Sequence, residues 1–203
     1  DDPQYPCRPM DRDRDGFLIG EGAAALILES RAHAEQRGSS AIASVSAAGI
    51  MSDPTGITQI DEQGTAVAAL LDQTLAYAPP RAVDYINVHA TGTISNDRAE
   101  ALGISQSRWL RHSDQPDPFV SGFKGAIGHL LGGAGSVEAA LTLHSLHSGQ
   151  LMPTTGLHHP DPAFRIRLLS QGTAVDHPVH RAVKLSLGFG GHLACVVLDA
   201  ASG

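Results

Sequence analysis

The sequence predicts a layered α/β domain, in which a mixed β-sheet is covered by helices. Short apolar runs typical of strands alternate with segments whose apolar residues recur at helical spacing. Near the C-terminus, the apolar runs Ala182 to Leu187 and Leu193 to Leu198 flank a glycine-rich loop, which predicts a hairpin and therefore a mixed sheet. A length of 203 residues, with 42% apolar and 17% charged residues, is typical of a globular domain.

The first part of the chain predicts two strands and one short helix. The apolar run that ends Gly20 to Glu29 is typical of a buried strand. Helix formers then follow from Ser30 to Arg37, with Ser30 as N-cap and Gly38 as the stop. The next strand is expected over Ile42 to Ala48.

The middle of the chain predicts a strand between two helices. After a loop from Met51 to Ile60, Asp61 to Leu75 carries apolar residues at helical spacing. Val83 to Val88 is expected to be a short strand that runs directly into a histidine. A further helix should begin within Asp97 to Gly103, with Asn96 or Asp97 as its cap.

The remaining elements alternate between strand, helix and irregular chain. Ser113 to Pro118 is a polar connector, and Phe119 to Ser121 is expected to be a brief strand. Ser136 to His147 predicts a helix that stops at Gly149, and the three prolines within Leu151 to Arg167 predict an irregular segment.

A glycine-rich stretch between Lys124 and Glu138 is the first candidate for chemistry. It places Lys124 five residues before His129, and a helix is expected to start near Gly135 with Glu138 in its first turn. Glycines allow close approach to the backbone, and a helix start offers unpaired N–H donors. We therefore expect this stretch to line an active site.

Two further loops carry side chains suited to ligand binding. His89-Ala90-Thr91-Gly92-Thr93 follows a predicted strand, at the edge where α/β sheets bind ligands. The histidine is suited to acid–base chemistry, although a structural histidine is equally compatible with the pattern. Phe189 stands alone among glycines and is either a packed anchor or a gate.

Charge and composition exclude several functions. The net charge of −7 argues against a nucleic-acid surface, and no apolar run is long enough to span a membrane. Cys7 and Cys195 lack the spacing of a disulfide scaffold or a zinc site, and the pair His144 and His147 has no further ligand nearby. The chain opens with Asp rather than Met, so we expect an excised piece of a longer protein. The charged residues 8–16 are compatible with an ion-paired loop or a solvated one.

Four motifs together resemble one known family. They are RPMDRDRDGFLIGEGAAALILE, NVHATGTISNDRAE, KGAIGHLLGGAGSVEA and SLGFGGHLACVVL, in this order from Arg8 to Leu198. Their order and spacing are similar to those of beta-ketoacyl synthases, the condensing enzymes of fatty acid and polyketide synthesis. The residues of these motifs are most similar to those of the elongating synthases of bacterial and mitochondrial type II systems. The resemblance implies a thiolase-like fold of two similar halves, of which residues 1–203 are the C-terminal domain.

The resemblance implies roles for five polar residues. His89 and His129 resemble the two histidines that polarise a malonyl thioester and promote its decarboxylation. Lys124 resembles the lysine that orders the site, with Glu100 as its expected ionic partner. Glu138 resembles the glutamate on the helix after the second histidine.

The resemblance also implies residues that bind and gate the substrate. Thr91 and Thr93 resemble threonines that hydrogen-bond the phosphopantetheine arm, and Phe189 resembles a gating phenylalanine whose N–H belongs to an oxyanion hole. Two positions depart from the family pattern. Leu193 replaces an asparagine, which puts the gating geometry in question, and Ile94-Ser95 replaces a continuation that contains proline.

The implied activity is decarboxylative condensation to a 3-ketoacyl thioester. The implied partners are acyl carrier protein, acyl and malonyl thioesters and a second subunit in a homodimer. No metal or organic cofactor is expected beyond the phosphopantetheine of the carrier, and the expected location is bacterial cytoplasm or mitochondrial matrix. The nucleophilic cysteine is expected in an N-terminal half outside this chain, since neither cysteine here suits that role. The alternative is a non-catalytic partner or remnant, against which the two histidines and Lys124 argue.

Overall fold

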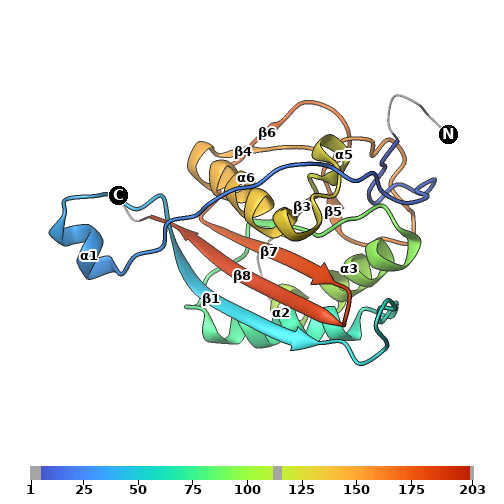
Figure 1. Cartoon of the computed structure of the whole chain (residues 1–203), viewed down its shortest axis with the longest axis horizontal. Helices are drawn as coiled ribbons and strands as arrows, with labels where there is room; N and C mark the ends of the chain where they lie inside the picture. Colours follow the sequence, from blue (N-terminus) through green and yellow to red (C-terminus); the bar gives the residue numbers. More distant parts are fainter. Residues whose placement is uncertain (1–5, 112–115, 202–203) are drawn as a thin grey trace.

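The sheet at the centre of the molecule has six strands in the order β1-β8-β7-β2-β3-β5 (Figure 1). The computed structural model describes residues 6–111 and 116–201. The strands of this sheet, in chain order, are β1 (Ala43–Ser52), β2 (Tyr85–Asn87), β3 (Phe119–Ser121), β5 (Arg167–Leu168), β7 (Arg181–Gly188) and β8 (His192–Ala200). A separate pair is formed by β4 (Gln150–Leu151) and β6 (Val175–Asp176).

The sheet is mixed, as the sequence predicted. Strands β1, β8 and β7 pair antiparallel, whereas β7, β2, β3 and β5 pair parallel. The expected hairpin is formed by β7 and β8 around the glycine loop, in which Gly190 and Gly191 both adopt positive φ angles that favour glycine. The parallel pairing brings the carboxyl ends of β2, β3 and β7 to the same edge of the sheet.

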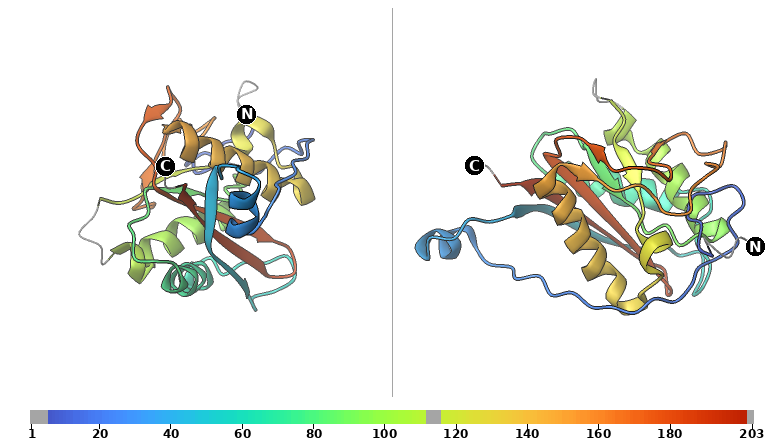
Figure 2. Two further views of the ribbon diagram at one scale, coloured as in Figure 1. Left: turned by 90° about the vertical axis from the view of Figure 1, so that its left-hand side faces the viewer. Right: turned by 90° about the horizontal axis from the view of Figure 1, so that it is seen from above.

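Helices cover both faces of the sheet (Figures 1 and 2). On one face lie α2 (Thr65–Tyr77) and α3 (Ile94–Gln106), and across the other lies α6 (Ala134–Ser148). Shorter helical segments complete the described chain: α1 (Arg31–Gln36), α4 (Arg108–Arg111), α5 (Lys124–Ile127) and the 3₁₀ turn η1 (Leu131–Gly133). No described helix is long and apolar enough to cross a membrane.

Each face of the sheet has its own apolar core. The larger cluster packs α2 and α3 against side chains of β2, β7 and β8, including Leu71, Ile86 and Leu185. The smaller cluster packs α6 against the other face, where Tyr85 and Leu146 are buried. Alternate residues of β7 therefore serve different cores, since successive side chains of a strand point to opposite faces.

Most expected elements are confirmed, with small changes of boundary. β3 matches its expected range, and Gly149 ends α6 in the left-handed conformation. Ser30 caps α1 by accepting a hydrogen bond from the His33 amide. Most of the connector expected at Ser113 to Pro118 lies outside the described residues.

The expected start of α3 was wrong. The helix begins at Ile94 with Thr93 as N-cap, so that Asn96 and Asp97 lie in its first turn. The Asp97 carboxylate instead accepts the backbone amides of Met10 and Gly92. It therefore ties two loops to the helix.

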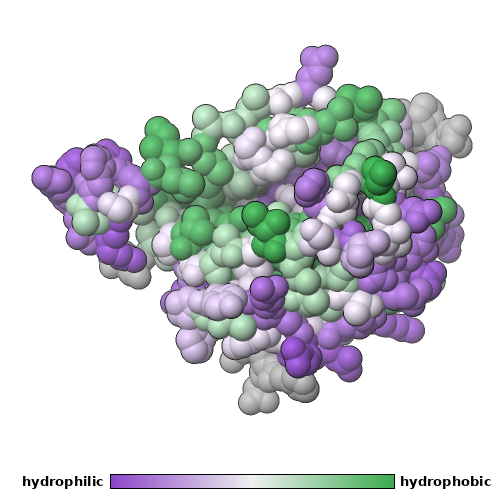
Figure 3. All heavy atoms as spheres, turned by 60° about the horizontal axis from the view of Figure 1, so that its bottom comes forward, coloured by the Kyte–Doolittle hydropathy of each residue, from purple (hydrophilic) through white to green (hydrophobic). Residues whose placement is uncertain are grey.

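The strand expected within Gly20 to Glu29 is also absent. These residues run extended along the molecular surface towards α1 without any ladder pairing (Figure 2). Ile27 and Leu28 are 92% and 78% exposed. An apolar run forms a buried strand only where it can pair with a neighbouring strand of a sheet. No described strand lies beside this segment. Figure 3 shows hydrophobic residues gathered beside the hydrophilic projection formed by α1.

Candidate active site

The expected site residues meet at the shared carboxyl edge of β2, β3 and β7. His89 follows β2, Lys124 begins the helix after β3, and Phe189 follows β7. Because these strands are parallel, their carboxyl ends form one rim of the sheet, where α/β proteins bind ligands. His129 reaches the same place from the turn between α5 and η1.

The loop that carries His89 is held in place by a buried carboxylate. The two oxygens of Glu100 on α3 accept the amides of His89 and Ala90, each at 2.6 Å. Asn96 donates to the same carboxylate at 2.9 Å. Ala90 takes a positive φ of 42°, which a non-glycine residue adopts only where its surroundings fix it. Burial raises the pKa of Glu100 to about 7, against the lowering effect of these amides.

Lys124 is completely buried and links His89 to α6. Its Nζ lies 3.1 Å from Nδ1 of His89, donates to the carbonyl of the same residue, and contacts Oε1 of Glu138 at 2.5 Å. Burial lowers the pKa of Lys124, while Glu138 opposes that shift. An ammonium group has three hydrogens, and here each has an acceptor.

This geometry corrects two expectations. The ionic partner of Lys124 is Glu138 and not Glu100, whose oxygens are turned to backbone amides. Glu138 also lies in the second turn of α6 rather than the first, because that helix starts at Ala134.

His129 stands beside His89 with its backbone and ring both fixed. The two ring centroids are 5.1 Å apart and the ring planes meet at 83°. Its Nδ1 accepts the Leu131 amide at 3.1 Å, and Phe17 packs edge-on at 5.0 Å. Its amide donates to the Leu18 carbonyl and its own carbonyl accepts the Gly20 amide.

Both histidines are therefore set up as neutral donors through Nε2. An Nδ1 that accepts a hydrogen bond carries no proton, so the proton of the neutral ring sits on Nε2. Burial, and after it the charges of Lys124 and Lys184, hold the pKa of His89 well below its usual range. Burial and Lys124 also lower the pKa of His129. Two such N–H groups can stabilise a negative charge that develops on a substrate oxygen.

Lys184 is a member of this cluster that the sequence reasoning missed. It lies on β7, is 3% exposed, and places its Nζ 2.7 Å from Oε2 of Glu138. The signal was present in the sequence, because a lysine interrupts the otherwise apolar run Ala182 to Leu187. A charged side chain in an expected buried strand requires a buried partner.

The residues expected to bind and gate the substrate arm lie on the loops that follow β2 and β7. The hydroxyls of Thr91 and Thr93 lie 2.8 Å apart, and Thr91 is buried. Phe189 is 74% exposed at the tip of the β7–β8 hairpin. Leu193, which departs from the family pattern, is buried in the larger core opposite Leu187 and therefore stabilises the base of that hairpin.

The charged segment 8–16 is an ordered, ion-paired loop. Arg8 contacts Asp15 at 3.3 Å, and the buried Arg14 contacts Asp161 at 2.9 Å and Asp97 at 3.7 Å. The Arg14 guanidinium also lies over the ring of Phe164. Of the two readings left open, the ion-paired one is confirmed.

Neither cysteine of the chain is an activated nucleophile. Both are free and buried. Burial raises the pKa of Cys7, and it raises the pKa of Cys195 to about 12. A thiol with a raised pKa holds little of the reactive thiolate at neutral pH.

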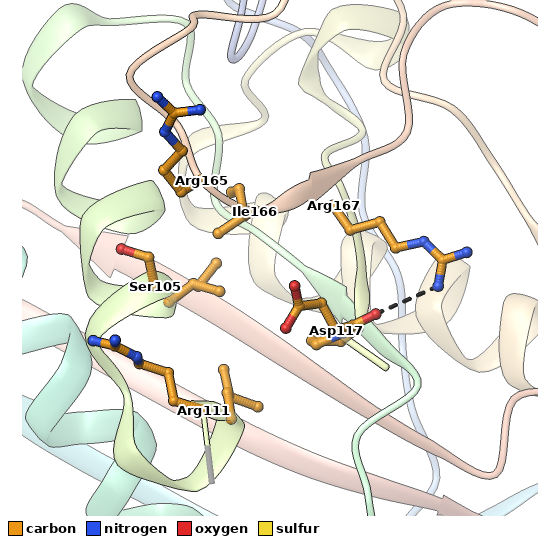
Figure 4. Close-up of a pocket in the computed structure, with 9 residues that line it drawn as sticks. Ser105, Arg111, Asp117, Arg165, Ile166 and Arg167 are labelled. Carbon is orange, nitrogen blue, oxygen red and sulfur yellow. Dashed lines mark hydrogen bonds between the residues drawn. The ribbon is translucent and has the colours of Figure 1, made fainter. Parts of the chain in front are cut away.

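Two other features lie away from the histidines. A hollow lined by Ser105, Arg111, Asp117, Arg165 and other residues lies where β3 and β5 begin, which is the opposite edge of the sheet (Figure 4). Asp11, Asp13 and His159 also lie together. There the Asp11 carboxylate accepts the amides of Asp13, His158 and His159, so it has the role of a loop cap.

Comparison with known proteins identifies the family. The family model for "Beta-ketoacyl synthase, C-terminal domain" matches residues 42–158. The chain belongs to the beta-ketoacyl synthase family. It is 38% identical over 191 residues to the mitochondrial 3-oxoacyl-[acyl-carrier-protein] synthase of Arabidopsis thaliana. It is 36% identical over 194 residues to 3-oxoacyl-[acyl-carrier-protein] synthase 2 of Mycobacterium bovis.

Solved ketosynthase structures share the fold. A chain from a type II PKS acyl-carrier protein in complex with its ketosynthase superimposes with a TM-score of 0.90 at 28% identity, over 99% of this chain and 49% of that one. A beta-ketoacyl synthase from Burkholderia phymatum gives a TM-score of 0.87 at 29% identity, over 96% and 46% of the two chains. The predicted thiolase-like α/β fold is thereby confirmed.

The match is to part of each relative. It covers 93% and 95% of this chain, but 41% of the Arabidopsis relative and 45% of the Mycobacterium relative. The matched family model describes a C-terminal domain. The chain thus spans less than half the length of these two relatives.

Proposed function

We propose that this chain supplies the malonyl-activating part of a ketosynthase site. The proposed reaction is condensation of malonyl-acyl carrier protein with an acyl thioester to give 3-ketoacyl-acyl carrier protein. The observation that carries the proposal is the pair of adjacent imidazoles, His89 and His129, each of which accepts a hydrogen bond at Nδ1. This arrangement offers two Nε2–H donors to one substrate oxygen.

The donors act on the charge that decarboxylation creates. When the bond between the malonyl α-carbon and its carboxylate breaks, CO2 leaves and the electron pair spreads onto the thioester oxygen as an enolate. Hydrogen bonds from His89 and His129 to this oxygen grow stronger as the charge develops, and so lower the barrier. The α-carbon then attacks the acyl carbonyl, a C–C bond forms, and the thiolate that held the acyl group leaves.

Other residues position the histidines and the substrate. Lys124 fixes the tautomer of His89 through Nδ1, in the manner of a partner that orients a catalytic imidazole. Thr91 and Thr93 are proposed to hydrogen-bond the phosphopantetheine arm. Phe189 is proposed to gate the site and to donate its N–H to the acyl oxyanion.

The acyl group is proposed to be held outside this chain. Cys7 and Cys195 are buried thiols with raised pKa values, so neither is suited to form the thioester. Acyl carrier protein and a second subunit are proposed as partners by family membership. No cofactor beyond the carrier's phosphopantetheine enters the proposed reaction.

Release of CO2 from malonyl-acyl carrier protein tests the proposal. In the protein that contains this chain, His129→Ala and His89→Ala should each lower the release rate about 100-fold, the loss typical of one oxyanion donor. The matched control is His144→Ala, an exposed histidine on α6 that should leave the rate unchanged. If both site variants release CO2 at the wild-type rate, the histidine roles are wrong and the chain acts as a non-catalytic partner.

A further inference from the structure

The lysines of this chain are confined to the histidine site. Of fourteen basic residues, twelve are arginines and only Lys124 and Lys184 are lysines. Both are buried, and both contact the same carboxylate, Glu138. Arginine supplies every other cation, so an ammonium is used only where a compact, point-like charge must fit in a closed space.

Lys184 and Lys124 contact different oxygens of the Glu138 carboxylate. Oε1 of Glu138 contacts Lys124 and Oε2 lies 2.7 Å from Nζ of Lys184. Oε2 accepts no aligned hydrogen bond from the described residues, and Lys184 donates instead to the Leu185 carbonyl. The second contact is therefore one of charge rather than of directed hydrogen bonding.

The neighbouring strand presents a further acceptor on this side. In the parallel ladder Asn87 of β2 stands opposite Lys184 of β7, so their side chains leave the sheet on the same face, beneath α6. Oδ1 of Asn87 is buried and has no hydrogen-bond partner in the described part of the chain. A buried oxygen without a partner therefore lies on the same face of the sheet as Lys184.

The charges around His89 leave a positive excess. Lys124 and Lys184 contribute two ammonium groups and Glu138 one carboxylate; His129 is held neutral. Glu100 and Asp97 are the other acids that face the loop: burial favours the neutral form of both, and Arg14 lies 3.7 Å from Asp97. Without Lys184, Lys124 and Glu138 would form a balanced pair, and burial would remain as the main factor that disfavours a proton on His89.

We propose that Lys184 is a positioning residue of the histidine site, which compensates Glu138 so that the charge of Lys124 keeps His89 a neutral Nε2–H donor. The catalytic consequence rests on the proposed function, but the electrostatic role does not. Lys184 touches no reacting atom in this scheme. It acts on His89 through Glu138 and through the field of its own charge.

Titration of His89 by ¹⁵N-histidine NMR tests the proposal on the chain without substrate. In the wild type His89 should remain neutral with its proton on Nε2 down to acid pH. Lys184→Met keeps the length and packing of the side chain but removes the charge, so the His89 midpoint should rise. The double variant Lys184→Met, Glu138→Gln restores the net charge and should bring the midpoint back towards the wild type. The exposed His33 on α1 is the internal reference and should not move.

A second measurement covers the case in which Lys184→Met does not fold. Labelling with ¹³Cε-lysine gives two resonances, one for each lysine. In the Glu138→Gln background, which leaves no buried carboxylate unpaired, removal of Lys184 should raise the midpoint of Lys124, because the two ammonium groups repel each other.

The outcomes separate this inference from the proposed function. Unchanged His89 and Lys124 titrations in the lysine variants would overturn the role of Lys184, whether or not the protein releases CO2. A shifted His89 midpoint in a protein whose His129→Ala variant retains full CO2 release would support Lys184 and count against the proposed function alone.

Discussion

All three hydrogens of the Lys124 ammonium are donated to acceptors inside the candidate site. Its three contacts go to the ring and carbonyl of His89 and to Glu138. A rotation of the ammonium would therefore leave a buried acceptor unpaired, at a cost of about 1–3 kcal/mol for each lost partner. Lys124 consequently sets both the orientation and the tautomer of His89, which its packing alone would not determine.

Acetylation of amines under native conditions should modify neither lysine. Because Lys124 and Lys184 are 0% and 3% exposed, reagent can reach them only when the fold opens, and both should react at least about 100-fold more slowly than in denatured chain. Mass spectrometry of proteolytic fragments measures both rates. Rapid native acetylation of either lysine would show that the cluster is open to solvent.

Motifs predicted the histidines but not all the groups that control them. His89, His129 and Lys124 stand in recognisable local sequences, and the structure brings them together. Which carboxylate faces Lys124 depends on where α3 and α6 cross the sheet, which no local pattern shows. For that reason Glu100 was assigned as an ionic partner, and the contribution of Lys184 was overlooked.

At the level of elements, one ion pair fastens the hairpin that carries Phe189. Arg181 at the start of β7 pairs with Asp199 of β8 through two contacts, of 2.6 Å and 2.8 Å. The same guanidinium donates to the carbonyls of Pro79 and Arg81, in the segment that follows α2. The pair thus joins both strands of the hairpin to a neighbouring layer.

Asp199→Asn should lower the free energy of unfolding by about 2 kcal/mol at pH 7, because the partly buried carboxylate loses its charge-assisted hydrogen bonds to Arg181. Burial opposes ionisation of Asp199, but Arg181 and Ser46 outweigh it and hold the pKa of the carboxyl below its usual range. Its stabilisation is therefore complete above the ordinary carboxyl pKa and is lost as the pH falls through the lowered value.

Urea denaturation near neutral pH and again at about pH 3 measures this change. The difference in free energy of unfolding between wild type and Asp199→Asn should be smaller in acid than near neutral pH. Asp176→Asn, on the exposed β6, is the matched control and should cost less than about 0.5 kcal/mol. An equal gap at both pH values would show that Asp199 stabilises by shape and not by charge.

The predicted ends of helices were right where a local interaction of the backbone or of a capping side chain determines them. Gly149 and Ser30 end or begin their helices through left-handed backbone and side-chain capping, and both were predicted. The start of α3 was missed because Asp97, an apparent cap, is drawn to distant amides. Capping residues signal a helix start only when nothing else competes for their oxygens.

At the scale of the whole molecule, one extended segment of the described chain exposes apolar side chains and pairs with no strand. The extended segment from Glu21 to Glu29 makes no ladder, and Ile27 and Leu28 are largely exposed. The sequence predicted a strand there because its residues suit one. Whether an apolar run becomes a strand depends on a neighbouring sheet, which lies beyond any pattern within the run itself.

Amide hydrogen exchange rates should distinguish this extended segment from the strands of the sheet. In the 203-residue chain, amides from 21 to 29 should exchange at rates close to those of an unfolded peptide, whereas those in the middle of β7 should exchange only on global unfolding. The Gly20 amide, which donates to the His129 carbonyl, and the His129 amide, which donates to the Leu18 carbonyl, serve as protected controls at the boundary. Slow exchange across 21–29 would show that the segment is already paired.

The bridge between Ile19 and His129 has a consequence for cooperativity. The Gly20 amide holds the carbonyl of His129, and the same chain continues directly into the exposed apolar run. The exposed run of Ile27 and Leu28 is therefore connected, along one extended segment, to the backbone of a histidine of the candidate site. If a surface that covers the run also shifts this backbone, a ligand that favours one position of His129 must change the affinity of that surface by the same factor.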